Sequence, residues 1–233
     1  MQPKVKRIVD LTRLADLNTE ISEAYPRPRR ADHFSYANKI GPYSVHAEEY
    51  TFVGQWGTHL DAPSHFSQGG RSISDIPVDD LFIPLVVVDV REQVENSAGY
   101  EIELQDLLRH ERQFGTIPRG SFVAVCSGWS QMAMRGAPKQ AAPGWSLSAL
   151  RYLVESKKVV GVGHEPLDTD PGLKALAGEY PAEEYLLVHD CYQIEGLCNL
   201  DTLIGCEGFV SIGVPLIAGS PGFPVRVLAI EFA

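Results

Sequence analysis

The stretch Gln55-Trp-Gly-Thr-His-Leu-Asp-Ala-Pro-Ser-His-Phe66 constrains the fold and the chemistry of this chain more than any other segment. Gly57 and Pro63 both disfavour a helix here, and the β-branched Thr58 adds to that effect. An extended backbone is therefore expected, with side chains that alternate between two faces.

An extended backbone places Gln55, Gly57, His59 and Asp61 on one side of the chain. His59 and Asp61 would then lie about 7 Å apart at Cα, close enough for both side chains to reach one ion. Gly57 between Gln55 and His59 would leave room for a pocket. After Pro63 the chain turns, so His65 would approach from another direction.

These residues supply nitrogen and oxygen ligands without a thiolate, a donor set that suits Zn²⁺ or Mn²⁺. Two other interpretations of His59, Asp61 and His65 remain open on spacing alone. They could be surface polar residues, or a His–Asp hydrogen bond could hold a loop in place.

Composition narrows the class of protein. The chain has 233 residues, with 30 acidic against 20 basic side chains and a formal net charge of -10. Phosphate binding needs clustered Lys and Arg, so we expect no nucleic-acid partner. The length suits one α/β domain over residues 1–233.

Neither a membrane span nor a signal peptide is predicted. No apolar run approaches the roughly 20 residues that cross a bilayer, and the first residues lack the apolar core of a signal peptide. The 4 cysteines follow no CxxC pattern and are expected to be reduced thiols. A cytoplasmic location without membrane association is expected.

The remaining chain predicts an α/β fold in which strands outnumber helices. Apolar, β-branched runs bounded by Gly, Pro or charges predict buried strands. These runs are Lys6–Leu11, Leu81–Val90, Ser121–Cys126, Lys158–Val162, Tyr185–Val188, Gly208–Ile217 and Val225–Phe232. Tyr43–Gly57 predicts a half-exposed strand or hairpin, and helices are expected over Glu103–Phe114 and Leu147–Ser156, with a turn or two at Leu173–Gly178. Irregular connections favour a mixed, curled sheet over a simple βαβ array.

The segment Gln55–Phe66 resembles the signature of the cyclase family of metal-dependent hydrolases, which includes bacterial kynurenine formamidase and isatin hydrolase. That signature reads His-x-Gly-Thr-His-x-Asp-x-Pro-x-His-Phe, and the chain matches every specified position except the first. Ile8–Thr12, Ser127–Trp129 and Glu195–Leu200 are similar to further family segments. The resemblance implies a swivelling β/β/α-like fold and a homodimer or homotetramer.

The resemblance also assigns roles to individual residues. His59 and Asp61 match metal ligands, Glu195 matches a metal-binding carboxylate, and His65 matches the general acid/base. Gln55 replaces the family's first histidine ligand. Its amide oxygen would bind a hard ion more weakly, or its amide would hydrogen-bond a metal-bound water; direct ligation is the favoured interpretation.

One divalent ion, Zn²⁺ or Mn²⁺, is expected. The two-metal formamidases have another histidine about three helical turns before the carboxylate that Glu195 matches. Here that region contains Glu183 and Glu184, and His189 falls close to Glu195. A second ion is therefore not expected.

The implied activity is hydrolysis of an amide, formamide, lactam or lactone bond in a small, often aromatic carboxylate, with an arylformamidase-type reaction as the leading case. A metal-activated water would attack and His65 would move the proton. Expected substrate-binding residues are Trp56, Phe66, Trp129 and His164. A metal-containing binding protein without catalysis is the alternative, and a Cys191–His189 pair is a distant third.

Overall fold

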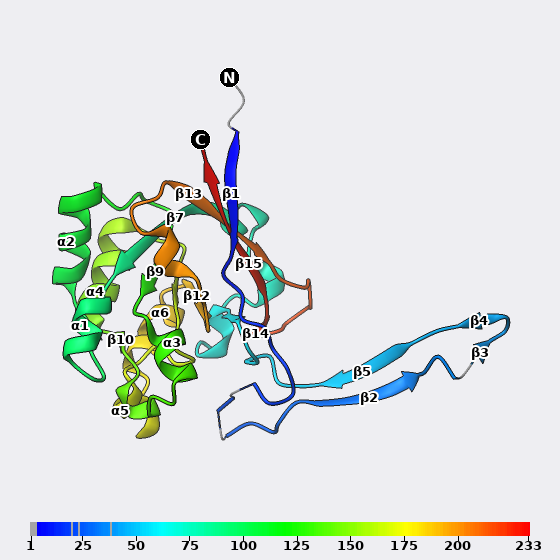
Figure 1. The fold of residues 1–233 in the computed structure, drawn as a ribbon. Helices are drawn as coiled ribbons and strands as arrows, with labels where there is room; N and C mark the ends of the chain where they lie inside the picture. Colours follow the sequence, from blue (N-terminus) through cyan, green and yellow to red (C-terminus); the bar gives the residue numbers. More distant parts are fainter. Residues whose placement is uncertain (1–3, 20, 23, 38) are drawn as a thin grey trace.

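A curled nine-stranded sheet forms the centre of the computed structural model, which describes residues 4–19, 21–22, 24–37 and 39–233 (Figure 1). The strand order is β1-β15-β13-β7-β9-β11-β12-β6-β14. The strands are β1 (Val5–Asp10), β6 (His59–Asp61), β7 (Phe82–Asp89), β9 (Phe122–Cys126), β11 (Gly161–His164), β12 (Tyr192–Glu195), β13 (Gly208–Gly213), β14 (Gly222–Pro224) and β15 (Arg226–Phe232). β7, β9, β11 and β12 run parallel, and the other pairs are antiparallel, which confirms the predicted mixed sheet.

The central parallel strands are buried on both faces, which explains their continuous apolar sequences. Leu85 and Val87 of β7 belong to a core cluster with residues of β6, β12 and β15. Val88, on the opposite face of β7, packs in a second cluster with Leu107 and Leu150 from the helices. The sheet therefore separates two cores.

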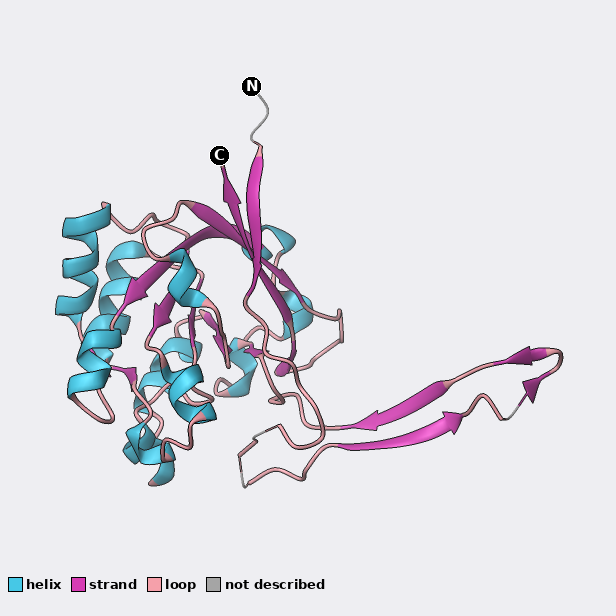
Figure 2. Ribbon diagram, in the orientation of Figure 1, coloured by secondary structure: helices cyan, strands magenta, loops and turns pink. Residues whose placement is uncertain are grey.

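Helices cover the second core on one side of the sheet (Figure 2). They are α1 (Arg91–Asn96), α2 (Leu104–Phe114), α3 (Trp129–Met134), α4 (Leu147–Arg151), α5 (Gly172–Leu176) and α6 (Pro181–Val188). The predicted helix Leu147–Ser156 is α4 followed by a π-helical turn, Tyr152–Lys157. Two short parallel strands, β8 (Glu101–Ile102) and β10 (Gly144–Trp145), connect the loop between α1 and α2 with the loop before α4.

The strand predicted at Tyr185–Val188 is wrong, because these residues form the second half of α6. Pro181 occupies the start of α6, a position where its fixed φ favours a helix. Leu186 and Leu187 are both fully buried in this helix. The run is therefore apolar because the helix is buried, not because it is a strand.

A long hairpin extends from the body of the protein as an arm (Figure 1). Its strands β2 (Arg29–Phe34) and β5 (Ala47–Thr51) pair antiparallel, and β3 (Lys39–Ile40) pairs with β4 (Tyr43–Ser44) near the tip. Of the half-exposed strand or hairpin predicted over Tyr43–Gly57, the structure contains β4 and β5, which form one side of this hairpin, and residues 52–57 are not in a strand.

Only the centre of the Gln55–Phe66 segment is a strand. β6 covers His59–Asp61, and a 3₁₀ turn follows at Pro63–His65. The expected role of Gly57 as pocket space is corrected: its φ is +67°, and a Cβ there would lie 3.0 Å from the Ala15 Cβ. Glycine is needed for the backbone turn that leads into β6.

Two further expectations concern the described part of the chain. It contains no helix that is long and apolar enough to cross a membrane. All of its cysteines are free: Cys126 and Cys191 are buried, and Cys198 and Cys206 are half-buried. Burial raises the pKa of the Cys191 thiol to about 12, which argues against a nucleophilic role.

Candidate metal centre

The candidate site is built by antiparallel pairing of β6 with β12. Glu195 pairs directly with His59, and Gln193 pairs directly with Asp61. Directly paired residues share one face of a sheet, so their side chains converge. This strand pairing brings together residues that are more than 130 positions apart in sequence, such as Asp61 and Gln193.

His59 is oriented as a metal ligand would be. Its Nδ1 lies 2.9 Å from the carbonyl oxygen of Gly57, which can accept a hydrogen bond and so leave Nε2 free of a proton. Nε2 lies 3.3 Å from Asp61 Oδ2 and 3.4 Å from Glu195 Oε2. This buried nitrogen has no hydrogen-bond partner of acceptable geometry.

Three buried ligand atoms, from His59, Asp61 and Glu195, lie within 4.8 Å of one another. An unsatisfied buried nitrogen beside two carboxylates fits a divalent ion, because the ion would satisfy all three groups. The residues present therefore suit the metal that the motif predicts.

The charges of this cluster depend on one another. Burial would lower the pKa of His59, but Asp61 and Glu195 raise it well above its ordinary value. Burial opposes ionisation of Asp61, yet His59 holds the pKa of that carboxyl down at about 2. Glu195 is affected similarly: burial raises its pKa, and the neighbouring side chains of His164 and His59 bring it below the ordinary value. A metal ion would compete with a proton on His59.

A second group of ligand atoms shares Asp61 and adds His65 and Glu183. His65 Nε2 lies 3.9 Å from Glu183 Oε1. Glu183 stands in the first turn of α6, whose backbone N–H groups donate to the carboxylate of Asp170. Burial, followed by the charges of Glu195 and Asp61, raises the pKa of Glu183 well above its usual range.

Gln55 contacts the cluster through Asp61. Its Nε2 donates to Asp61 Oδ1 at 2.9 Å. The backbone of Gly222 on β14 leaves the room for this contact, because a Cβ there would lie 2.4 Å from Gln55 Nε2 and 2.6 Å from Asp61 Oδ1.

Polar side chains behind the cluster hold Glu195. His164 Nε2 lies 3.5 Å from Glu195 Oε1, and the indole N–H of Trp145 donates to His164 Nδ1. On the other side, Gln193 Nε2 donates to Glu195 Oε1 at 3.1 Å, and the hydroxyl of Thr169 donates to Gln193 Oε1. His164 is thus a buried partner of Glu195 and does not line the adjacent cavity.

A cavity of about 310 Å³ opens onto the cluster. His65, Phe66, Tyr25 and Tyr180 line it together with the candidate ligands. A second cavity of about 280 Å³ shares Tyr180 with the first and reaches Trp129. Trp56 lies outside both cavities and packs instead against Phe52.

Sequence reasoning missed Gln193, Tyr25 and Gly222 and gave Glu183 no role. Gln193 could have been found from strand alternation, because it stands two residues before Glu195. The other three carry no sequence signal, since their positions depend on how distant segments pack.

Comparisons with known proteins identify the family of this chain. A family profile described as "Putative cyclase" matches residues 9–171, which include the motif and the carboxyl end of β11. The chain belongs to the cyclase family. The predicted family resemblance is confirmed.

Solved structures share the fold of this cyclase-family chain. Isatin hydrolase A from Labrenzia aggregata, bound to benzyl benzoate, is 28% identical with a TM-score of 0.86, covering 97% of this chain and 94% of that one. Isatin hydrolase A from Ralstonia solanacearum is 25% identical with a TM-score of 0.82, covering 97% and 92%. An isatin hydrolase bound to the product analogue thioisatinate is 24% identical with a TM-score of 0.85, covering 99% and 94%. No curated protein matches the chain.

Proposed function

We propose that this cyclase-family chain is a metal-dependent hydrolase that cleaves an amide, formamide, lactam or lactone bond in a small carboxylate-bearing molecule. The observation that carries the proposal is the unsatisfied Nε2 of His59, buried between Asp61 and Glu195 beside a cavity. The structural likeness to isatin hydrolases supports the same class of reaction.

His59, Asp61 and Glu195 would hold one ion, Zn²⁺ or Mn²⁺, with Gln55 as the weakest member of the set. Such an ion, when bound, activates a water molecule and polarises the carbonyl group under attack. The buried partners of these residues fix the donor atoms in place, which is how outer hydrogen bonds tune a metal site.

His65 is the proposed general acid/base. Its ring lies at the wall of the cavity and is partly accessible, with 20% of the side chain exposed. A histidine in this position can take a proton from the attacking water and return it to the departing nitrogen or oxygen. Glu183 lies near enough to orient the imidazole.

The walls of the cavity suit a flat substrate. Phe66, Tyr25 and Tyr180 surround the space in front of the candidate ligands. Rigid aromatic walls favour a planar ring, so a formyl group or a lactam on an aromatic carboxylate is the leading substrate class. Arylformamidase-type hydrolysis is the specific form proposed.

Replacement of His65 tests the division of roles. We expect His65→Ala to lower kcat by about 10²–10⁴-fold while bound metal stays at one ion per chain. Metal content is measured by mass spectrometry on the same samples. Loss of an ion together with activity would place His65 in the ligand shell with Asp61 and Glu183, and a second ion in the wild-type protein would support that assignment.

A chelation experiment tests the whole mechanism. Protein that is verified as metal-free should be inactive towards N-formyl aromatic amines, isatin or dienelactones, and added Zn²⁺ or Mn²⁺ should restore activity. Full activity of the metal-free protein would refute the proposal.

The alternative function is a binding protein that contains metal but lacks catalysis. The replacement of the family's first histidine by Gln55 motivates it, because an amide is a weaker ligand than imidazole. A folded, metal-loaded sample that stays inactive on the whole substrate panel would favour this alternative.

A further inference from the structure

A second group of ligand-type side chains lies on the arm formed by β2 and β5. Asp32 on β2 pairs directly with Glu48 on β5, so the two carboxylates face each other on one side of the ribbon. Like charges in this arrangement destabilise a strand pair, and a two-stranded hairpin alone is only marginally stable in water. A cation between the carboxylates would reverse that cost.

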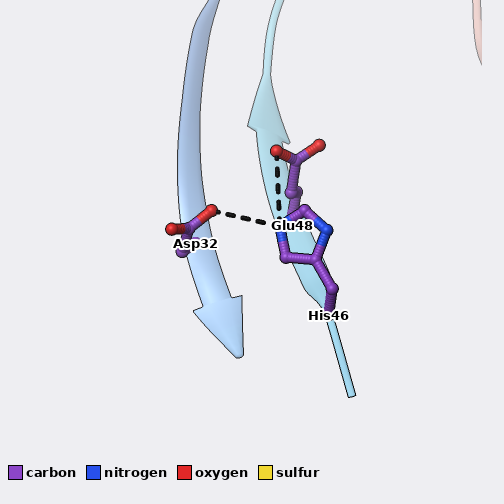
Figure 3. A group of neighbouring side chains, drawn as sticks. All are labelled: Asp32, His46 and Glu48. Atoms are coloured by element: carbon purple, nitrogen blue, oxygen red, sulfur yellow. Dashed lines mark hydrogen bonds and ion pairs between the residues drawn. The ribbon is translucent and has the colours of Figure 1, made fainter. Parts of the chain in front are cut away.

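His46 adds a nitrogen ligand to this face. It stands two residues before Glu48, and one edge of its ring faces both carboxylates in Figure 3. Its Nε2 lies 3.4 Å from Asp32 Oδ1 and 3.7 Å from Glu48 Oε1. All three ligand atoms lie within 4.8 Å of one another.

These separations fit one ion. Bonds of about 2.0–2.2 Å in a tetrahedral arrangement separate neighbouring ligand atoms by roughly 3.3–3.6 Å. His46 and Glu48 belong to one strand of the hairpin and its lead-in, and Asp32 belongs to the other strand, so an ion bound by them would cross-link the two strands. The side chain of Asp32 is 63% exposed and that of His46 38%, which leaves a coordination position open to water.

Neighbouring residues hold Glu48 and also compete for it. The hydroxyl of Tyr50 donates to Glu48 Oε2 at 2.5 Å, which leaves Oε1 directed towards His46. The guanidinium Nε of Arg30 lies 3.4 Å from the same Oε1. Arg30 therefore supplies part of the positive charge that an ion would bring.

We propose that Asp32, His46 and Glu48 form a surface site for a zinc-class divalent cation that ties β2 to β5. The donor set of one imidazole and two carboxylates suits Zn²⁺ or Cu²⁺. The site uses none of the residues of the buried His59 centre and is independent of the proposed hydrolase activity.

Zinc titration of the full chain tests the site. The buried centre is loaded first, excess metal is removed by gel filtration, and further Zn²⁺ uptake is then counted by mass spectrometry. We expect His46→Ala to lose one equivalent of this later uptake while the first ion stays bound. The matched control is His33→Ala on the same strand as Asp32, because the His33 ring packs edge to face on Phe34. The control should bind as the wild type does.

Two results would overturn the proposal. One is equal later uptake by wild type and His46→Ala; the other is the same loss of zinc from His33→Ala. Electron paramagnetic resonance with Cu²⁺ gives an independent readout, since a nitrogen hyperfine signal should be present in wild type and absent in His46→Ala.

Arg30 provides a test with the opposite sign. Because its guanidinium competes for Glu48 Oε1, Arg30→Ala should bind the later Zn²⁺ more tightly than wild type, whereas Glu48→Gln should bind it at least tenfold more weakly. Weaker binding by Arg30→Ala would contradict the site.

Discussion

At the residue scale, Gly222 matters to the candidate metal centre because glycine has no Cβ, and a Cβ at this position would collide with Gln55 and Asp61. Its Cα faces both the Gln55 amide and the Asp61 carboxylate across the β6–β14 pair. A Cβ there would fill the space that their hydrogen bond occupies, which gives Gly222 a role in the site although it offers no ligand.

We expect Gly222→Ala to weaken metal binding by about 10–100-fold, the range seen when partners of metal ligands are altered. The added Cβ would push Gln55 and Asp61 apart, and overpacking would also cost about 1–3 kcal/mol of stability. Competition with a fluorescent chelator measures the affinity. Gly213→Ala is the control, because its Cβ would meet Arg226 at an ordinary 3.5 Å. Unchanged affinity in Gly222→Ala would show that the Gln55–Asp61 contact does not matter for binding.

The sequence predicted residues that the structure brings close together. The motif and the family resemblance brought His59, Asp61 and Glu195 together, and the structure places their ligand atoms within 4.8 Å. Glu183 was not assigned a role, because local patterns do not say where the first turn of α6 points, whereas Gln193 could have been found from its place two residues before Glu195. The functional roles themselves stay predictions.

At the element scale, a glutamate near the end of α2 ties that helix to its surroundings. Glu111 forms an ion pair with Lys157 at 2.5 Å, and it accepts hydrogen bonds from the Tyr152 hydroxyl and from the backbone N–H of Ile117. Burial opposes ionisation of Glu111, but these partners lower its pKa below the ordinary value.

This shift predicts a dependence of stability on pH. A carboxyl whose pKa is lower in the folded state stabilises the fold at pH values above its unfolded pKa, near 4.3, and loses that contribution as the pH falls through the folded value. Glu111→Gln should therefore lower stability at pH 7 more than at pH 3. Urea unfolding at both pH values measures the difference, with Glu95→Gln on the exposed face of α1 as control. An equal loss at both pH values would contradict the ion-pair explanation.

Elements differed in how well the sequence predicted them. The core strands β7, β9, β13 and β15 were predicted from their apolar, β-branched runs, and β9 is buried along its whole length. The same rule produced the error at Tyr185–Val188, since a buried helix of two turns is also apolar throughout. β12 was missed because two of its four residues are Gln193 and Glu195, which a buried strand carries only where it builds a site.

At the scale of the whole molecule, oligomerisation stays a prediction that rests on the family resemblance. We expect a homodimer or homotetramer, and light scattering coupled to gel filtration measures the mass. The exposed aromatic side chains on the arm, Tyr36 and Tyr43, are each 71% accessible and could become covered in such an assembly. A monomer over the whole accessible concentration range would contradict the expectation.

Metal binding should stabilise the entire fold. The ligands come from β6 and β12, so the unfolded chain has no assembled site, and an ion that binds only the folded state adds about 2.7 kcal/mol at a free concentration of 100 times Kd. We expect Tm to rise with Zn²⁺ or Mn²⁺ in a calorimetric scan, and the effect to be reduced in Glu195→Gln. A Tm independent of metal in the wild type would argue against a site formed by these strands.

The pairing of β6 with β12 also sets a time at which metal can first be bound. Asp61 leaves the ribosome long before Glu195, and at roughly 5–20 residues per second the interval is about 7–27 s. During that interval the nascent chain can offer a metal only isolated ligands. The affinity of such ligands for different divalent metals follows the Irving–Williams order and is not modified by the geometry of a folded site. Any selection among ions by the assembled site would therefore be made only when the chain is nearly complete.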